Sequence, residues 1–188
     1  MARWQSGARE RLAVAALHLF SSQGFEDTTV AEIAALAGLT ERTFFRYYTD
    51  KAEVLFAGQE EFDRLFLDGL DASTDTHPLE LITAALANAA AFFPDEKRLW
   101  SRERQVVVAG TVALHERELH KMSALVDALT EALVTRNVDP TAAALASEAG
   151  VSVFRRSFAT WIAEGETRTF GDIQHGVLNQ LQALLEPT

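Results

Sequence analysis

Hydrophobic residues recur every three or four positions along most of the chain, which is the spacing of amphipathic α-helices. A polar stretch at 71–77 and the breakers Pro94, Gly110, Asn137 and Gly165 interrupt this pattern. The pattern predicts an all-α fold of about nine helices. We expect them near 5–23, 30–37, 41–47, 51–70, 79–93, 95–109, 112–136, 140–164 and 170–186.

Residues 29–51, TVAEIAALAGLTERTFFRYYTDK, carry the strongest local signals. Thr29 and Glu32 have the T-x-x-E spacing of a helix capping box. Gly38 follows where a residue with positive φ ends a helix and lets the chain turn sharply. Thr40 is a natural N-cap for the next helix, and Asp50 starts a third cap pattern. The segment is therefore predicted to form two short helices around a glycine turn.

The second of these helices carries an unusual surface. An ordinary helical hairpin accounts for the caps and the glycine, but not for polar and basic residues crowding so short a helix. These residues are Thr40, Arg42, Thr43, Arg46, Tyr47 and, at the start of the next element, Lys51. A helix-turn-helix that lays its second helix in the DNA major groove has this layout.

At these residues the chain resembles the TetR family of bacterial regulators, whose signature runs roughly T-V-x-x-I-A-x-x-A-G-V-S-x-G-T-[LF]-Y-x-[HY]-F-x-x-K-[ED]. The matching positions are Thr29, Val30, Ile33, Ala34, Ala37, Gly38, Thr43, Phe44, Tyr47, Lys51 and Glu53. Arg42 departs from the common Gly, Phe45 from Tyr and Tyr48 from Phe. Because Arg42 and Phe45 fall on the face expected to read bases, the operator of another member does not carry over.

Roles in DNA binding follow from side-chain chemistry. Arg42 is the best candidate for reading a guanine edge, and Phe45 can contact a thymine methyl group. Thr29, Thr43 and the amides at the helix start capped by Thr40 suit phosphate oxygens.

Three further polar residues of this segment have competing roles. Lys51 is expected to act as a point charge for a phosphate. Arg46 and Tyr47 can touch base edges or backbone, and for Arg46 an ion pair with Asp50 is nearly as plausible. Phe44 and Tyr48 are expected to be core residues.

The net charge of −10 at first argues against a nucleic-acid partner. Residues 1–55 hold six Lys or Arg and seven Asp or Glu, a net of −1, whereas residues 56–188 hold eleven and twenty, a net of −9. The acidity therefore lies mostly outside the predicted DNA-binding segment. The cations near the groove are Arg42, Arg46 and Lys51, with Arg3 and Arg9 at the N-terminal end. Salt screens the distant charges, because the Debye length is about 8 Å.

The resemblance implies two further features of the C-terminal part. One is a pocket for a small-molecule effector, for which the candidate residues are Phe62, Phe66, Phe93, Trp100, Arg104, Met122, Leu125 and Phe158. Most of these side chains can equally be core, and Arg104 can instead pair with a carboxylate. The other is a homodimer through the last two long helices, with candidates Trp161, Ile173, Val177, Leu181 and Leu184. Here too an intramolecular core is the alternative.

The sequence offers little support for an enzyme or a membrane protein. His115 and His120 are five residues apart, off the spacing of H-E-x-x-H, so no metal site is expected. There is no phosphate-binding glycine loop and no nucleophile elbow, and we expect no cofactor and no catalytic residue. The chain has no cysteine, which suits a reducing cytoplasm. Its longest apolar run is too short to span a membrane.

The combined prediction is a cytoplasmic, homodimeric, ligand-responsive repressor that binds a palindromic double-stranded DNA operator. Residues 1–52 form the helix-turn-helix domain and residues 53–188 the ligand-binding and dimerisation domain. Repression, as opposed to activation, rests on the family's habit alone. The alternatives are a helical protein-binding module and a small-ligand enzyme on an α bundle. Sequence-selective retention on DNA distinguishes the first reading from both.

Overall fold

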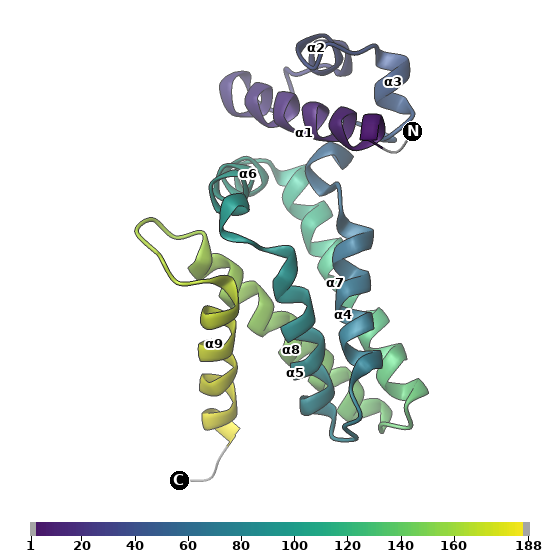
Figure 1. The fold of residues 1–188 in the computed structure, drawn as a ribbon, viewed down its shortest axis with the longest axis vertical. Coiled ribbons are helices and arrows are strands. Elements are labelled where there is room, and N and C mark those ends of the chain that lie inside the picture. The colour runs from purple at the N-terminus through teal and green to yellow at the C-terminus, as the bar shows by residue number, and fades with distance from the viewer. Residues whose placement is uncertain (1–2, 186–188) are drawn as a thin grey trace. The chain divides into compact units, whose positions relative to one another are not determined.

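A computed structural model of the chain describes the backbone of residues 3–185 and the side chains of residues 7–184, so the side chain of Arg3 lies outside it. Within residues 3–185 every regular element is helical, and the predicted all-α fold is confirmed (Figure 1). The α-helices are α1 (Arg3–Gln23), α2 (Val30–Leu36), α3 (Glu41–Phe45), α4 (Gln59–Ala72), α5 (Pro78–Ala89), α6 (Arg98–Gly110), α7 (Val112–Thr135), α8 (Pro140–Trp161) and α9 (Phe170–Leu185). Three 3₁₀ helices are η1 (Glu53–Phe56), η2 (Ala90–Phe92) and η3 (Asp95–Lys97).

The one helix predicted over 51–70 is wrong, because the structure divides it into η1 and α4. Gly58 lies between them with a φ of 95°. This conformation is open to glycine and ends a right-handed helix. The periodicity of the apolar residues continued across the break, so the pattern alone did not reveal it. The other predicted helices have the expected order, and their ends differ by a few residues.

The chain forms two compact units. The first contains residues 1–59 and 103–117, and the second contains residues 60–102 and 118–188. The compact N-terminal unit therefore includes a segment from far along the sequence, which a boundary drawn near residue 52 leaves out. The functional division at residue 52 stays a prediction, since compactness does not test which part binds DNA.

In the first unit, α2 packs on α1 and α3 packs on α2, as Figure 1 shows. The side chains of Leu12, Ile33 and Phe44 are completely buried. Tyr48 is also buried, and its ring is tilted by 51° against that of Phe44, with 5.5 Å between the ring centroids. Both aromatic residues were predicted to be core, and this is confirmed. Their burial holds α3 so that its remaining side chains face outward.

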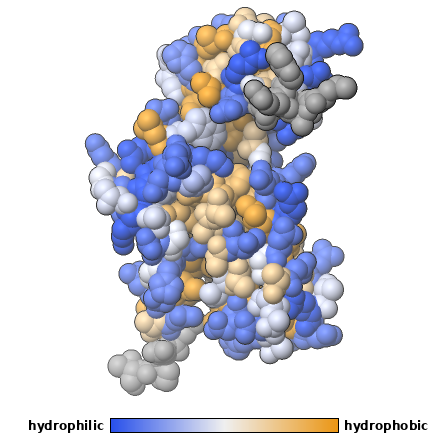
Figure 2. Space-filling model, viewed as in Figure 1, coloured by the Kyte–Doolittle hydropathy of each residue, from blue (hydrophilic) through white to orange (hydrophobic). Residues whose placement is uncertain are grey.

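In the second unit, α8 packs against both α5 and α9. Asp139 caps α8 by accepting hydrogen bonds from the amides of Thr141 and Ala142. A cluster of aromatic rings fills the core around Phe93, whose ring lies 4.6 Å from Phe170 and 5.7 Å from Trp161. On the face drawn in Figure 2, hydrophobic residues are interspersed among mostly hydrophilic ones.

Candidate nucleic-acid interface

The N-terminus of α2 is closed by a reciprocal capping box. The Glu32 amide donates to Thr29 Oγ1 at 3.2 Å, and the Thr29 amide donates to Glu32 Oε2 at 2.8 Å. The Thr29 hydroxyl also donates to that carboxylate at 2.8 Å. The backbone hydrogen bond from Thr29, followed by the hydroxyl, lowers the pKa of Glu32 below its usual value. Thr29 is thus engaged with an anion, which makes this helix start less attractive to a phosphate than its sequence suggested.

The turn and the cap that set the direction of α3 are present as predicted. Gly38 has a φ of 66°, and its amide donates to the Ala35 carbonyl at 3.0 Å. Thr40 caps α3 by accepting from the Thr43 amide at 3.2 Å. The hydroxyl oxygens of Thr40 and Thr43 lie 3.0 Å apart, so one donates to the other. The second hydroxyl hydrogen of this pair is available for a phosphate oxygen.

The outer face of α3 carries three exposed side chains that were predicted to contact DNA. Arg42 and Arg46 are exposed, and Phe45 is 55% exposed although it is a large apolar residue. Phe45 thus presents an apolar ring to solvent beside two guanidinium groups. The arrangement suits a base edge with a thymine methyl group and neighbouring phosphates.

A cationic cluster forms beside α3 around the ring of Tyr47. The guanidinium carbon of Arg46 lies 4.7 Å from the ring centroid, and that of Arg9 lies 5.5 Å from it. Arg46 Nη2 also donates to the Tyr47 hydroxyl at 2.7 Å. Arg9 was expected as a cation near the groove, but its contact with Tyr47 was not predicted. It is placed there by the fold of α1, and no local pattern in the sequence shows this.

Lys51 is held inside the first unit by backbone carbonyls. Its Nζ donates to the carbonyl oxygens of Phe25 at 2.6 Å, Thr28 at 2.9 Å and Glu26 at 3.1 Å. It also lies 4.4 Å from the centroid of the Phe25 ring. An ammonium group has three donors, and all three are used. The geometry therefore favours a structural role for Lys51 over the predicted phosphate contact.

Asp50 anchors the end of the helix-turn-helix to a distant part of the first unit. It accepts from the amides of Ala52 and Glu53 in the turn before η1. The predicted cap at Asp50 is only partly formed, because the N-cap of η1 is Ala52. The guanidinium of Arg117 donates to Asp50 Oδ2 at 3.0 Å and to Glu53 Oε1 at 2.8 Å. Burial alone raises the pKa of Asp50, but the bonds from Arg117 and the two amides outweigh it and lower the pKa. Since Arg117 takes the carboxylate, the alternative ion pair of Arg46 with Asp50 is not formed.

The residues predicted to line an effector pocket have different surroundings. Phe62, Phe66 and Leu125 are buried in the core of the second unit, with Phe93, Met122 and Phe158 packed against them. Trp100 is half-buried in that unit. Arg104 belongs to the first unit, where its Nε donates to the Leu55 carbonyl at 2.7 Å and its guanidinium lies over the Phe56 ring. The pocket at these positions stays a prediction, and the geometry favours the core alternative.

The residues predicted for a dimer surface divide into two groups. Trp161 is 0% exposed and Ile173 is 2% exposed, so both are core residues and cannot touch a partner in this conformation. Naming them as surface was wrong, because an apolar stripe on a helix marks the core and an interface alike. Val177 and Leu181 are half-buried, and Leu184 is 82% exposed. These three remain candidates.

Among the described residues, no cluster of three or more His, Asp or Glu side chains is arranged to hold a metal ion. No helix in the described part of the chain has the length and apolar character needed to cross a bilayer.

Known proteins resemble the helix-turn-helix region in sequence and nearly the whole chain in fold. Residues 12–57 match the family described as bacterial regulatory proteins, tetR family. The chain is 37% identical over 78 residues to the HTH-type transcriptional regulator TcmR of Streptomyces glaucescens, which covers 41% of this chain and 34% of TcmR. It is 32% identical over 114 residues to the transcriptional regulator MftR of Mycobacterium tuberculosis, covering 60% and 57% of the two chains. The alignments thus span from a third to just over half of these relatives.

A solved structure extends the likeness to nearly the full length. The transcriptional regulator FadR of Bacillus subtilis, in complex with stearoyl-CoA, superposes with a TM-score of 0.63 at 13% identity. The superposition covers 94% of this chain and 99% of FadR. At this identity the match shows the fold alone. The matching family and relatives are regulators and not enzymes.

Proposed function

We propose that this chain, which belongs to the TetR family of bacterial regulatory proteins, is a sequence-specific DNA-binding transcriptional regulator. The observation that carries the proposal is the outer face of α3. Arg42, Phe45 and Arg46 are exposed on a helix whose direction is fixed by Gly38 and Thr40. This is the arrangement required of a recognition helix in the major groove.

Contacts can be assigned by chemistry. Arg42 reads a base edge through its guanidinium fork, and Phe45 packs on a thymine methyl group. Arg46 and Arg9, held on the ring of Tyr47, contact phosphates, and the Thr40–Thr43 hydroxyl pair contacts a further phosphate. Thr29 caps α2, and Lys51 binds backbone carbonyls of the first unit. Both residues therefore stabilise the helix-turn-helix region. This division places specificity in Arg42 and Phe45 and general affinity in the flanking cations.

The proposal also includes a homodimer that binds two half-sites of a palindromic operator in the cytoplasm, represses transcription and releases DNA when an effector binds. A symmetric dimer matches the two-fold symmetry of such operators. The relatives support regulation, and the FadR complex shows that a protein of this fold binds a ligand. Each of these properties can be measured separately: repression, dimer formation, and release of DNA when an effector binds.

Selection of bound duplexes from a random library tests the DNA-binding proposal. The wild-type chain should enrich one palindromic motif. Arg42→Ala should relax one position in each half-site and weaken binding by about 1–3 kcal/mol. Arg64→Ala, an exposed arginine of α4, is the matched control and should leave the motif unchanged. Failure to enrich any sequence, or an unchanged motif with Arg42→Ala, would contradict the proposal or its assignment of that residue.

A further inference from the structure

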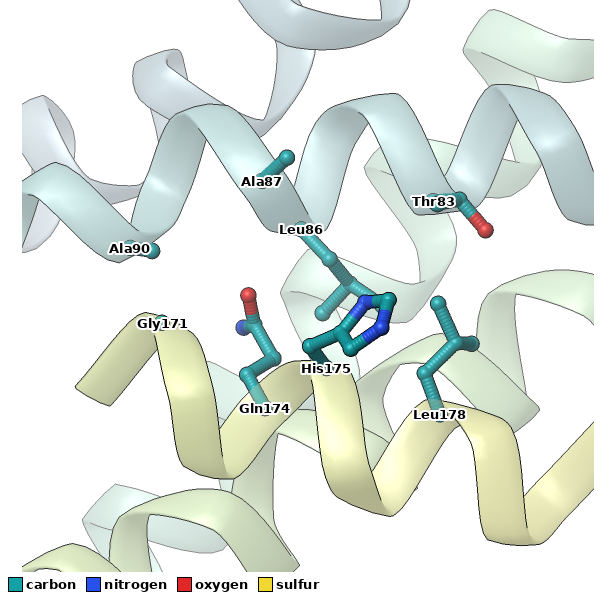
Figure 3. A pocket seen from close by; sticks show the side chains of 8 residues that line it. All are labelled: Thr83, Leu86, Ala87, Ala90, Gly171, Gln174, His175 and Leu178. Carbon is teal, nitrogen blue, oxygen red and sulfur yellow. The ribbon is translucent and has the colours of Figure 1, made fainter. Parts of the chain in front are cut away.

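A cavity of about 190 Å³ lies in the second unit between α5 and α9. Figure 3 shows Leu86 and Thr83 on the α5 side, and Gly171, Gln174, His175 and Leu178 on α9. None of the residues predicted for an effector pocket lines it. The cavity is thus separate from the aromatic core around Phe93.

Gln174 is the feature of this cavity that lacks a structural explanation. Its side chain is buried, with 4% exposed, yet its Nε2 has no hydrogen-bond partner. A buried donor without an acceptor costs free energy, and most buried polar groups are paired. The carboxamide of Gln174 lies among the side chains that line the cavity, where its NH2 group can donate to a molecule bound there. The unpaired donor therefore points to a missing acceptor.

The remaining lining restricts what that molecule can be. The described residues around the cavity include no Lys, Arg, Asp or Glu, and the ionisable side chain among them, that of His175, is exposed. An ion beside the buried Gln174 would therefore lack a buried, charged partner. Burying an unpaired ion is costly, which favours an uncharged molecule. The Thr83 hydroxyl already donates to the Leu79 carbonyl at 2.7 Å, which leaves Gln174 as the main buried donor. Leu86 and Leu178 provide an apolar surface for the rest of the molecule.

The volume sets the size of the ligand. A water molecule occupies about 30 Å³ in the liquid, so the cavity holds the equivalent of roughly six waters. Sites for drug-sized ligands are larger, at about 300–1,000 Å³. The space therefore suits one ring with a short substituent.

We propose that the cavity between α5 and α9 is a binding site for a compact, uncharged, ring-sized molecule whose carbonyl oxygen accepts a hydrogen bond from the carboxamide of Gln174. Binding itself is argued from the cavity alone. That such a molecule acts as an effector rests, in addition, on the proposed function as a ligand-responsive regulator.

Two probes that differ at one atom test the site. Acetophenone carries a carbonyl oxygen, and α-methylstyrene has a methylene group in its place. Titrations of the full chain labelled with ¹⁵N are followed by NMR, including the side-chain amide signal of Gln174. Wild type should bind acetophenone at least tenfold more tightly than α-methylstyrene, with shifts confined to α5, α9 and that amide. Benzoate, which is charged, should bind at least tenfold more weakly than acetophenone.

Two variants and their controls separate binding from folding. Gln174→Leu should lose the preference for acetophenone and keep or increase thermal stability, because it removes an unpaired buried group. Gly171→Phe should abolish binding, since Gly171 lines the cavity and an aromatic side chain there can occupy it. Gln180→Leu and Gly176→Phe lie on the same helix outside the cavity lining and should bind as wild type does.

Three results would overturn the proposal. Absence of saturable binding to wild type, equal binding by Gly171→Phe, or an unchanged preference in Gln174→Leu would each exclude the site. None of these results bears on DNA binding, which the duplex selection measures separately.

Discussion

Two basic residues of the helix-turn-helix segment have opposite surroundings. The Arg42 side chain lies in solvent on the outer face of α3. The ammonium of Lys51 is enclosed by the carbonyls of Phe25, Glu26 and Thr28. The sequence shows both as positive charges near a groove, because side-chain type alone does not reveal which donors are already used. The residue's surroundings, and not its charge, decide its role.

Replacing Lys51 with methionine should destabilise the first unit without removing a phosphate contact. Hydrogen bonds to charged groups contribute about 1.5–3 kcal/mol each, and partial exposure reduces this, so we expect a loss of about 2 kcal/mol in unfolding free energy. The slope of log K against log salt for DNA binding should stay unchanged. Arg46→Ala should reduce that slope by about 1. A reduced slope with unchanged stability in Lys51→Met would instead assign Lys51 to a phosphate.

At the scale of elements, the predictable features are those that depend on neighbours three or four residues apart. The Thr29–Glu32 box, the Thr40 cap and the turn at Gly38 are of this kind, and each was predicted from the sequence. The placement of Arg9 beside Tyr47 depends on how α1 packs, and the break at Gly58 on a conformation that an apolar pattern does not encode. The unpaired amide of Gln174 also required the tertiary structure, since α5 and α9 are distant in sequence.

The turn between α2 and α3 should favour glycine at residue 38, where φ is 66°. An L-residue in the left-handed region costs about 1–2 kcal/mol, so Gly38→Ala should lower the unfolding free energy by about that amount. Gly7→Ala is the matched control in α1, where a Cβ meets no atom within 4 Å. There alanine should raise stability by up to about 1 kcal/mol. Chemical denaturation measures both, and a loss of the same size in the two variants would contradict the assignment.

The ion pair between Asp50 and Arg117 should make part of the free energy of unfolding depend on pH. The pKa of Asp50 in the folded chain lies below its unfolded value, so its contribution is present above about pH 4 and is lost as pH falls through the folded pKa. Asp50→Asn should therefore lower unfolding free energy at neutral pH and flatten the acid limb of the stability curve. Because the side chain is 45% exposed, the loss is about 1 kcal/mol or less.

The matched control for this pH dependence is Glu116→Gln, at an exposed position of α7 in the same unit. It should leave the acid limb as in wild type. Arg117→Met removes the contacts with both Asp50 and Glu53, so its loss should equal or exceed that of Asp50→Asn. The double variant should cost less than the sum of the two single losses, since these share the Asp50–Arg117 contact. An additive double variant would show that the pair is not coupled.

At the scale of the whole molecule, charge is distributed unevenly along the chain. Residues 56–188 carry a net charge of −9, against −1 for residues 1–55. The negative charge of residues 56–188 repels DNA at low salt. We therefore expect it to disfavour nonspecific contacts more than the contacts made by the helix-turn-helix region. In the second unit, large apolar side chains remain exposed on the last two long helices, with Leu145 at 67% and Leu184 at 82%.

These exposed leucines carry the last prediction, that the chain is a dimer at micromolar concentration. Sedimentation equilibrium should give twice the 20.7 kDa mass of one chain. Leu184→Asp should shift the equilibrium toward monomer, because an aspartate desolvated at an apolar contact is costly. Leu99→Asp, at a leucine of α6 that is 63% exposed, should leave it unchanged. A wild-type monomer would contradict the dimer, whereas a dimer unaffected by Leu184→Asp would move the interface away from the end of α9.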